Sequence, residues 1–146
     1  MGHDYNEQEQ QRSNERVEMT GAIDPQVEQF LLDSIDTVPH LEALLLIFQS
    51  SAIVWTVAEL AARIYVNEKQ AAGILEDLTR RALVTRVEQA PAKYQYLARS
   101  EAQTELLEKV ARSYRTQLVQ VTRFIHSNAS GSVRDFARAF RLKDND

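Results

Sequence analysis

One short stretch, residues 67–81, carries both amide and cationic side chains and reads NEKQAAGILEDLTRR. Asn67, Lys69 and Gln70 come first, and a pair of arginines ends the stretch. Side chains of these types donate hydrogen bonds to phosphate oxygens and to the edges of bases. The chemistry that they suggest is recognition of an anionic polymer by hydrogen bonds and charge.

Groups that could perform catalysis or bind a metal are scattered along the chain. His3, His40 and His126 have no second histidine or carboxylate at ligand spacing on a shared face. The chain has no cysteine, which excludes disulfides and thiolate metal sites. It also lacks a glycine-rich phosphate loop and a nucleophile elbow. We therefore expect no enzyme activity, no metal site and no cofactor.

Residues 67–81 have the apolar spacing of a helix. At 100° per residue, Ala71, Ile74, Leu75 and Leu78 fall on one face, which we expect to be buried. The opposite face then carries Lys69, Ala72, Gly73, Glu76 and Arg80, with Gln70 and Asp77 alongside.

Two interpretations of this outward face are open. Gly73 costs roughly 1 kcal/mol in helix propensity and could permit close approach to the wall of a DNA groove. Glu76 and Asp77 oppose that reading, because duplex DNA carries one negative charge per ~1.7 Å. In the alternative, Glu76 pairs with Arg80 at i,i+4 on an ordinary solvated helix. The candidate DNA contacts are Asn67, Lys69, Gln70, Gly73, Arg80, Arg81 and Lys93.

Capping signals define the elements that hold this helix. Thr56–Glu59 and Asn67–Gln70 each match a capping box, so two helices start close together, as in a helix-turn-helix. An Asp24-Pro25 start predicts an earlier helix to about residue 35, and Thr37 caps a following helix that is apolar nearly all round. A short strand is expected at 52–55, and a hairpin at 84–97. Together these elements predict a mainly α, winged-helix fold.

Residues 53–97 resemble the winged helix-turn-helix of MarR-type and PadR-type bacterial transcription regulators. The segments that carry the resemblance are WTVAELAARIYVNEKQAAGILEDLTRRALV and TRVEQAPAKYQYLA. The resemblance implies a second helix in the major groove, a hairpin wing against phosphates or the minor groove, and terminal helices that form a dimer.

Two positions depart from that pattern. Ala82 stands where the families usually have glycine, and a left-handed cap at alanine costs about 1 kcal/mol, so we expect the helix to end differently. The wing is short, with Lys93 near its tip and Arg86 and Arg99 at its flanks.

A long helix is expected from a third capping box at Ser100 to about residue 127, because no breaker interrupts this stretch. One interpretation makes its apolar stripe a dimer interface, and the other packs it on the winged helix of its own chain. The sequence analysis favours a homodimer. The stripe comprises Leu107, Val110, Tyr114, Leu118, Val121 and Ile125.

The ends of the chain differ in charge. We expect residues 1–22 to form a disordered acidic tail, before a winged-helix domain at 23–99 and the long helix at 100–128. A short basic amphipathic helix and tail are expected at 129–146; residues 109–146 contain eight basic and three acidic residues. This basic segment could clamp a DNA backbone, lie on a membrane surface, or dock on an acidic partner, including the acidic tail.

The whole chain of 146 residues predicts one domain with appended helices. No apolar run approaches the ~20 residues that a membrane span needs, and no secretory signal is visible, so a cytoplasmic location is expected. The leading hypothesis is a transcriptional regulator that binds double-stranded DNA as a dimer, with residues 67–81 in the major groove. The alternative is a winged helix that binds a protein partner and no DNA.

Overall fold

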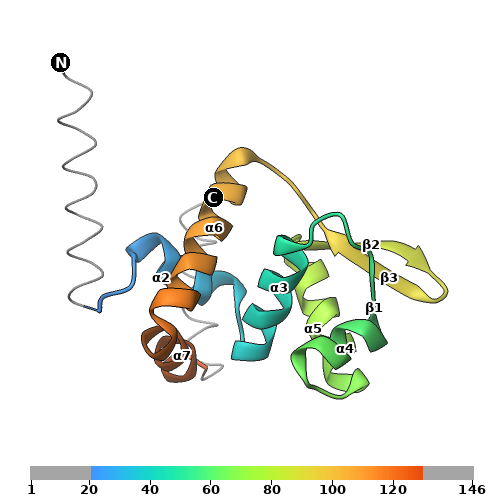
Figure 1. Ribbon diagram of the computed structural model, residues 1–146, viewed down its shortest axis with the longest axis horizontal. Coiled ribbons are helices and arrows are strands. Elements are labelled where there is room, and N and C mark those ends of the chain that lie inside the picture. The colour runs from blue at the N-terminus through green and yellow to red at the C-terminus, as the bar shows by residue number, and fades with distance from the viewer. Residues whose placement is uncertain (1–20, 130–146) are drawn as a thin grey trace, which may run out of the picture.

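The computed structural model describes residues 21–129, and this part of the chain forms a mainly helical winged-helix domain with a small antiparallel sheet (Figure 1). The segments expected to form an acidic tail and a basic C-terminal helix lie almost entirely outside the described residues. The elements in chain order are α2 (Pro25–Ser34), α3 (Val38–Gln49), β1 (Trp55–Thr56), α4 (Val57–Ile64), α5 (Glu68–Arg80), β2 (Val84–Gln89), β3 (Ala92–Tyr96), α6 (Glu101–Thr116) and α7 (Leu118–Ser127).

Side-chain caps start the helices at the positions that the sequence predicts. At Asn67 the capping box is complete, because the Asn67 side chain accepts from the backbone of Gln70 and the Gln70 side chain accepts from the backbone of Asn67. At Thr56 the box is only half formed, since the Glu59 carboxylate accepts from the Thr56 hydroxyl instead of from the backbone. The side chains of Asp24, Thr37 and Ser100 also accept a backbone N–H from the first turn of their helices.

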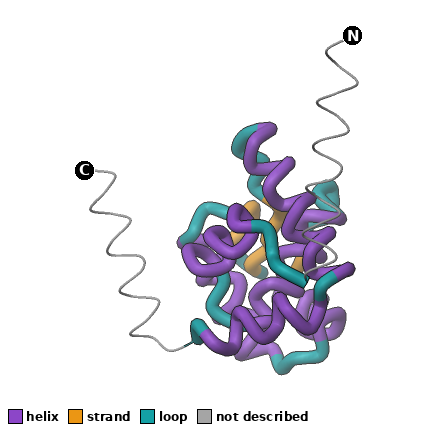
Figure 2. The backbone as a smooth tube through the Cα atoms, turned by 90° about the vertical axis from the view of Figure 1, so that its left-hand side faces the viewer, coloured by secondary structure: helices purple, strands orange, loops and turns teal. Residues whose placement is uncertain are grey.

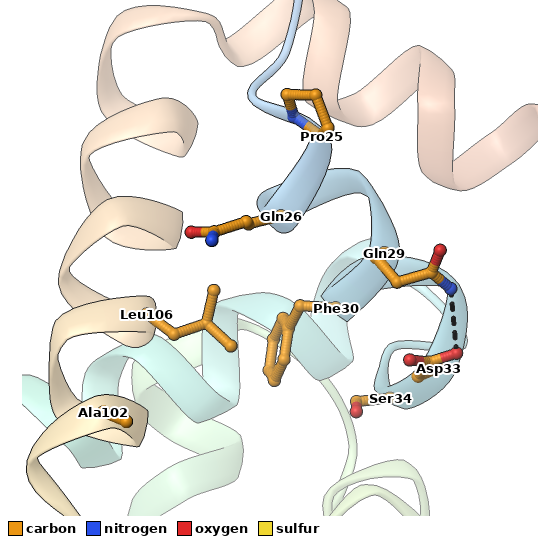
Figure 3. A pocket seen from close by; sticks show the side chains of 8 residues that line it. All are labelled: Pro25, Gln26, Gln29, Phe30, Asp33, Ser34, Ala102 and Leu106. Atoms are coloured by element: carbon orange, nitrogen blue, oxygen red, sulfur yellow. Dashed lines mark hydrogen bonds between the residues drawn. The ribbon is translucent and has the colours of Figure 1, made fainter. Parts of the chain in front are cut away.

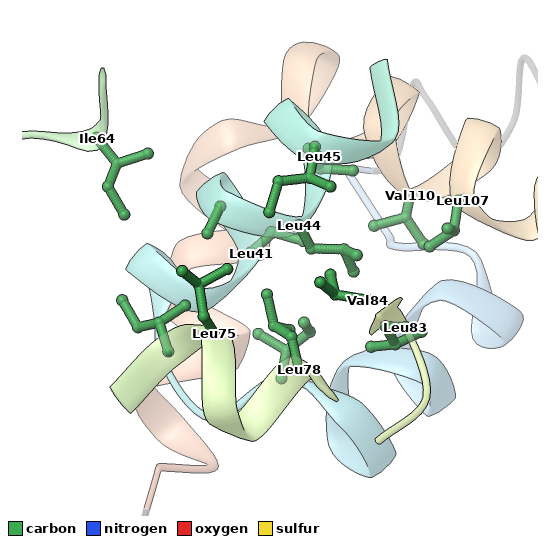
Figure 4. Close-up of a cluster of buried hydrophobic side chains, with 14 of the residues drawn as sticks. Leu41, Leu44, Leu45, Ile64, Leu75, Leu78, Leu83, Val84, Leu107 and Val110 are labelled. Atoms are coloured by element: carbon green, nitrogen blue, oxygen red, sulfur yellow. The ribbon is translucent and has the colours of Figure 1, made fainter. Parts of the chain in front are cut away.

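The central helix is α3, which packs against α4, α5, α6, α7 and β3. Its leucines meet side chains from α5 and from the start of β2 (Figure 4). Burial on nearly every side explains why this helix has apolar residues around most of its circumference. The inward face expected for α5 is confirmed, because Ala71, Ile74, Leu75 and Leu78 are all buried.

The sheet has the strand order β1-β3-β2, with both pairs antiparallel. The hairpin of β2 and β3 confirms the expected wing, and it extends away from the helices in Figure 1. A register shift between Arg86 and Glu88 leaves Val87 as an extra, exposed residue on β2. Such a bulge bends the strand and increases its twist, which shapes the wing.

The single helix expected from residue 101 to 127 is instead two helices, α6 and α7, which meet at Gln117. Gln117 leaves the helical conformation, with φ −130° and ψ 46°. Its buried side chain donates from Nε2 to the Ala22 carbonyl oxygen at 2.8 Å. The bond ties the break to a segment 95 residues away in the chain. The break is therefore linked to a long-range contact, which local helix signals around Gln117 do not predict.

Helices α2, α6 and α7 lie together on the side opposite the hairpin, where they cover the strands when seen from that side (Figure 2). Four members of the stripe expected to form a dimer interface pack into the core of their own chain: Leu107, Val110, Val121 and Ile125. The alternative interpretation therefore holds for these four side chains. Within the described residues, no helix is both long and apolar enough to cross a membrane.

Candidate nucleic-acid interface

The first turn of α5 presents hydrogen-bond donors to solvent. Asn67 and Gln70 use their side-chain oxygens for the capping box, at 2.8 Å and 3.4 Å, which leaves their amide NH₂ groups for other partners. Lys69 is exposed. A Cβ added at Gly73 would meet no atom within 4 Å, so packing inside the chain does not require glycine there.

The acidic residue Asp77 is turned away from the outward face of α5. Its carboxylate accepts a hydrogen bond from His40 Nε2 of α3 at 2.8 Å and is ion-paired with Arg80. The i,i+4 pair expected between Glu76 and Arg80 is therefore wrong: Arg80 pairs with Asp77 at i,i+3. One of the two carboxylates that would have opposed a phosphate backbone is already compensated by a cation on the same helix.

His40 bonds through both of its ring nitrogens, to the N-cap of its own helix α3 and to α5. Because a carboxylate only accepts, Nε2 carries the proton in the bond to Asp77. The other ring nitrogen, Nδ1, is hydrogen-bonded to the Thr37 hydroxyl, and those two atoms are 2.6 Å apart. The imidazole is buried, so these bonds hold α5 at a set position on α3.

Arg81 lies at the other side of this polar cluster. Its guanidinium Nη2 contacts both carboxylate oxygens of Asp36, at 3.1 Å and 3.0 Å, and its side chain is 17% exposed. We therefore assign Arg81 to positioning α5 against the connection between α2 and α3. Arg80, 68% exposed, remains at the surface.

The same cluster resembles a cation site, because ligand atoms of Asp36, His40 and Asp77 all lie within 4.8 Å of one another. The sequence does not predict this grouping, since Asp77 is far along the chain from Asp36 and His40. Each carboxylate is, however, already paired with an arginine, Asp36 with Arg81 and Asp77 with Arg80. A divalent ion would compete with both guanidinium groups for these carboxylates, so the arrangement fits a structural ion-pair network.

Helix α5 ends in a left-handed residue, contrary to expectation. Ala82 has φ 58°, and the Leu83 N–H donates to the Leu78 carbonyl at 3.0 Å. This is the six-residue bond of a Schellman motif, which requires a left-handed residue next to the helix end. Glycine would adopt this left-handed conformation at lower cost than alanine. Ala82 is held in it because the chain must turn back here to bury Leu83 and Val84 in the core.

The wing carries two cations, and one of them, Arg86, lies next to α5. Lys93 is ion-paired with Glu88 at 3.5 Å. Arg86 donates to the Tyr94 hydroxyl at 2.6 Å and lies over the Tyr94 ring. Arg86, Tyr94, Arg80, Thr79 and Glu76 line a shallow hollow between α5 and the wing. From the sequence Arg86 is only a charge at the flank of the wing, because its position over Tyr94 depends on the bulged register.

Of the expected dimer residues, Leu118 is 49% exposed and Tyr114 is half-buried. Both line a groove between α3 and the α6–α7 break, together with Leu45, Leu46 and Ala111. Val119, next to Leu118, is 55% exposed. This apolar surface is the part of the expected stripe that remains accessible.

A second hollow lies between α2 and α6 (Figure 3). These two helices are on the side of the molecule away from the wing (Figure 1). Phe30 and Leu106 face one another across it, and Gln26 and Gln29 supply amide groups at its edge. Gln29 donates to Asp33 at 3.2 Å, and Gln26 accepts from Lys109 of α6 at 2.9 Å. These bonds connect α2 with itself and with α6, and the hollow is remote from α5.

Comparisons with known proteins returned solved structures but no match to a family model or to a curated protein. The chain is similar to the multiple antibiotic-resistance repressor (MarR) from Listeria monocytogenes 4b F2365, at 14% identity and a TM-score of 0.47, over 99% of this chain and 91% of that chain. It is also similar to the MarR family transcriptional regulator SPO1453 from Silicibacter pomeroyi DSS-3, at 17% identity and a TM-score of 0.44, over 97% and 88%. The description of this chain as a winged-helix protein rests on its own helices and hairpin.

Proposed function

We propose that this protein is a transcriptional regulator that binds double-stranded DNA through α5 and the wing. The observation that carries the proposal is the division of charge on α5. Lys69 and two amide groups face outward at the start of the helix, while Asp77 is drawn toward His40 and Arg80. The outward face is thus more favourable to a phosphate backbone than the bare sequence of the helix indicates.

In this proposal the first turn of α5 enters the major groove. The amide groups of Asn67 and Gln70 supply donors for base edges or phosphates, and Lys69 supplies a charge. Gly73 has open space at its Cα, which lets the groove wall approach the helix backbone. Arg80, Arg86 and Lys93 border the hollow or the wing and are assigned to phosphates.

Binding as a homodimer is part of the same proposal, because two copies of the motif give affinity for two successive half-sites. The contact is assigned to the exposed Leu118 and Val119 and to the half-buried Tyr114. Leu118→Glu should shift the protein toward monomer in sedimentation velocity, with Gln120→Glu as the control, because Gln120 is exposed and lies two positions from Leu118, on another face of the same helix. Equal sedimentation of the two variants and the wild type would remove this surface from the proposal.

The test of DNA binding is fluorescence anisotropy with a labelled random duplex at low and physiological salt. We expect a nonspecific Kd on the order of 10⁻⁴–10⁻⁶ M that weakens steeply with salt. Lys69→Ala should lower the slope of log K against log salt by about 1. Lys109→Ala is the matched control, because it removes the same charge from α6 and should leave that slope unchanged.

The alternative function is a protein-interaction module, and the exposed Glu68 and Glu76 on α5 favour it. In that case the wild-type protein would not bind the duplex even at low salt. The Lys69→Ala and Lys109→Ala variants would then be indistinguishable from the wild type, and the regulator assignment would be withdrawn.

A further inference from the structure

Tyr65 is an exposed aromatic residue in the turn between α4 and α5. Its side chain is 94% exposed, whereas the other exposed large apolar side chains of the described residues range from 37% to 55%. The ring therefore contributes no packing to the fold. None of the hydrogen bonds found within the described residues uses its hydroxyl group.

The backbone at Tyr65 is left-handed, with φ 59° and ψ 45°. This conformation ends α4: the Tyr65 N–H bonds to the Ala61 carbonyl, and the Val66 N–H donates to the same oxygen at 3.1 Å. A residue with a Cβ is strained there, and glycine would satisfy the turn at lower cost. The fold thus gains nothing from the side chain of Tyr65 and is strained by its presence.

Tyr65 lies in the turn that leads directly into the first turn of α5, where the proposed DNA interface begins. One residue, Val66, separates it from the cap Asn67, so the Cα atoms of Tyr65 and Asn67 are at most about 7 Å apart. Its neighbour Arg63 is directed elsewhere, over the ring of Trp55 at 5.7 Å. A duplex that receives the first turn of α5 in its major groove brings backbone phosphates within reach of the α4–α5 turn.

We infer that Tyr65 contacts the DNA backbone, its phenol hydroxyl donating to a phosphate oxygen beside the groove that α5 enters. This inference rests on the proposed function and adds a contact that lies outside both α5 and the wing. A phosphate is a charged acceptor, and hydrogen bonds to charged groups are stronger than neutral ones. The loss of one such bond should weaken binding by about tenfold.

Three variants test the inference with the anisotropy assay and thermal unfolding. Tyr65→Gly should raise Tm by relieving the left-handed strain, and yet raise Kd about tenfold. Tyr65→Phe keeps the ring and the strain, and should raise Kd to a similar extent without raising Tm. Ala82→Gly is the matched control, because it relieves left-handed strain at the other end of α5 and should raise Tm with no change in Kd.

The possible results separate this inference from the proposed function. If Tyr65→Gly binds the duplex as tightly as the wild type while Lys69→Ala binds more weakly, DNA binding stands and the Tyr65 contact is refuted. If Tyr65→Phe alone retains full affinity, the hydrogen bond from the hydroxyl is refuted. If the wild type binds no duplex at any salt concentration, both proposals fail.

Discussion

Asp77→Ala tests the claim that a buried histidine holds the proposed DNA-binding helix in place. The substitution removes the carboxylate that accepts from His40 Nε2 at 2.8 Å. The next oxygen available to that nitrogen belongs to Asp36 and lies 3.9 Å away, too far for a hydrogen bond. The His40 N–H group would remain buried without an acceptor.

The magnitude follows from two opposing effects. A buried donor left without a partner costs about 1–3 kcal/mol. Replacement of aspartate by alanine inside a helix returns roughly 0.5 kcal/mol through helix propensity. We therefore expect Asp77→Ala to lower the free energy of unfolding by about 1.5 kcal/mol.

Glu76→Ala is the matched control, because it removes a carboxylate from the adjacent, exposed position of the same helix. It should change the free energy of unfolding by less than about 0.5 kcal/mol. In urea unfolding, where m is about 1–3 kcal/mol per molar for a small protein, the two midpoints should differ by about 1 M. A double-mutant cycle with His40→Ala should show that the two losses are not additive.

Equal midpoints for Asp77→Ala and Glu76→Ala would refute this reasoning. Such a result would mean that His40 is satisfied without Asp77, for example by water. Additive losses in the cycle with His40→Ala would have the same meaning, since residues that share a hydrogen bond should be coupled.

Three further predictions concern single positions. Gly73→Ala should stabilise the protein by about 1 kcal/mol in thermal unfolding, because the added Cβ meets open space in a helix. The same variant should bind the duplex more weakly, because the added methyl group obstructs the close approach of the groove wall. Unchanged affinity would contradict that close approach. Ala82→Gly should raise the free energy of unfolding by up to about 1 kcal/mol, since relief of left-handed strain outweighs the greater freedom of glycine in the unfolded chain. A lower free energy of unfolding for this variant would contradict the claim that Ala82 is strained. Burial of Tyr114, together with its hydrogen bond to Glu42, raises its pKa to about 12. The protonated phenol is therefore favoured in the folded state, and its contribution to stability should be complete below pH 10 and lost as the pH rises toward 12. Tyr114→Phe should remove this alkaline loss in urea titrations at a series of pH values, and a persistent loss would assign it to another group.

Local signals determined most of the secondary structure. A helix cap acts over three or four residues, so the pattern from Asn67 to Gln70 is sufficient to start α5 wherever the chain lies. The apolar spacing of Leu75 and Leu78 likewise selects the buried face of α5 with no reference to its partner. The winged-helix order follows from such signals taken in sequence.

Tertiary contacts decided which polar groups remain available. Asp77 is bound by His40, 37 residues earlier in the chain, and Arg81 is bound by Asp36, 45 residues earlier. No periodicity relates such positions, because the partners meet only after α3 has packed on α5. For this reason the sequence pattern paired Arg80 with Glu76 in one interpretation, and it placed Arg80 and Arg81 alike among the candidate DNA contacts.

The C-terminal helices show the same division between what local sequence determines and what tertiary contacts determine. Helix propensity from Glu101 to Ser127 is continuous, and by itself it predicts one helix with an exposed apolar stripe. The bond from Gln117 to the Ala22 carbonyl, formed across the fold, accompanies the break, and α7 packs on α2 and α3. The local sequence thus determined where helices can form. Long-range packing determined where these helices end and which of their faces reach solvent, because burial and pairing depend on segments that are distant along the chain.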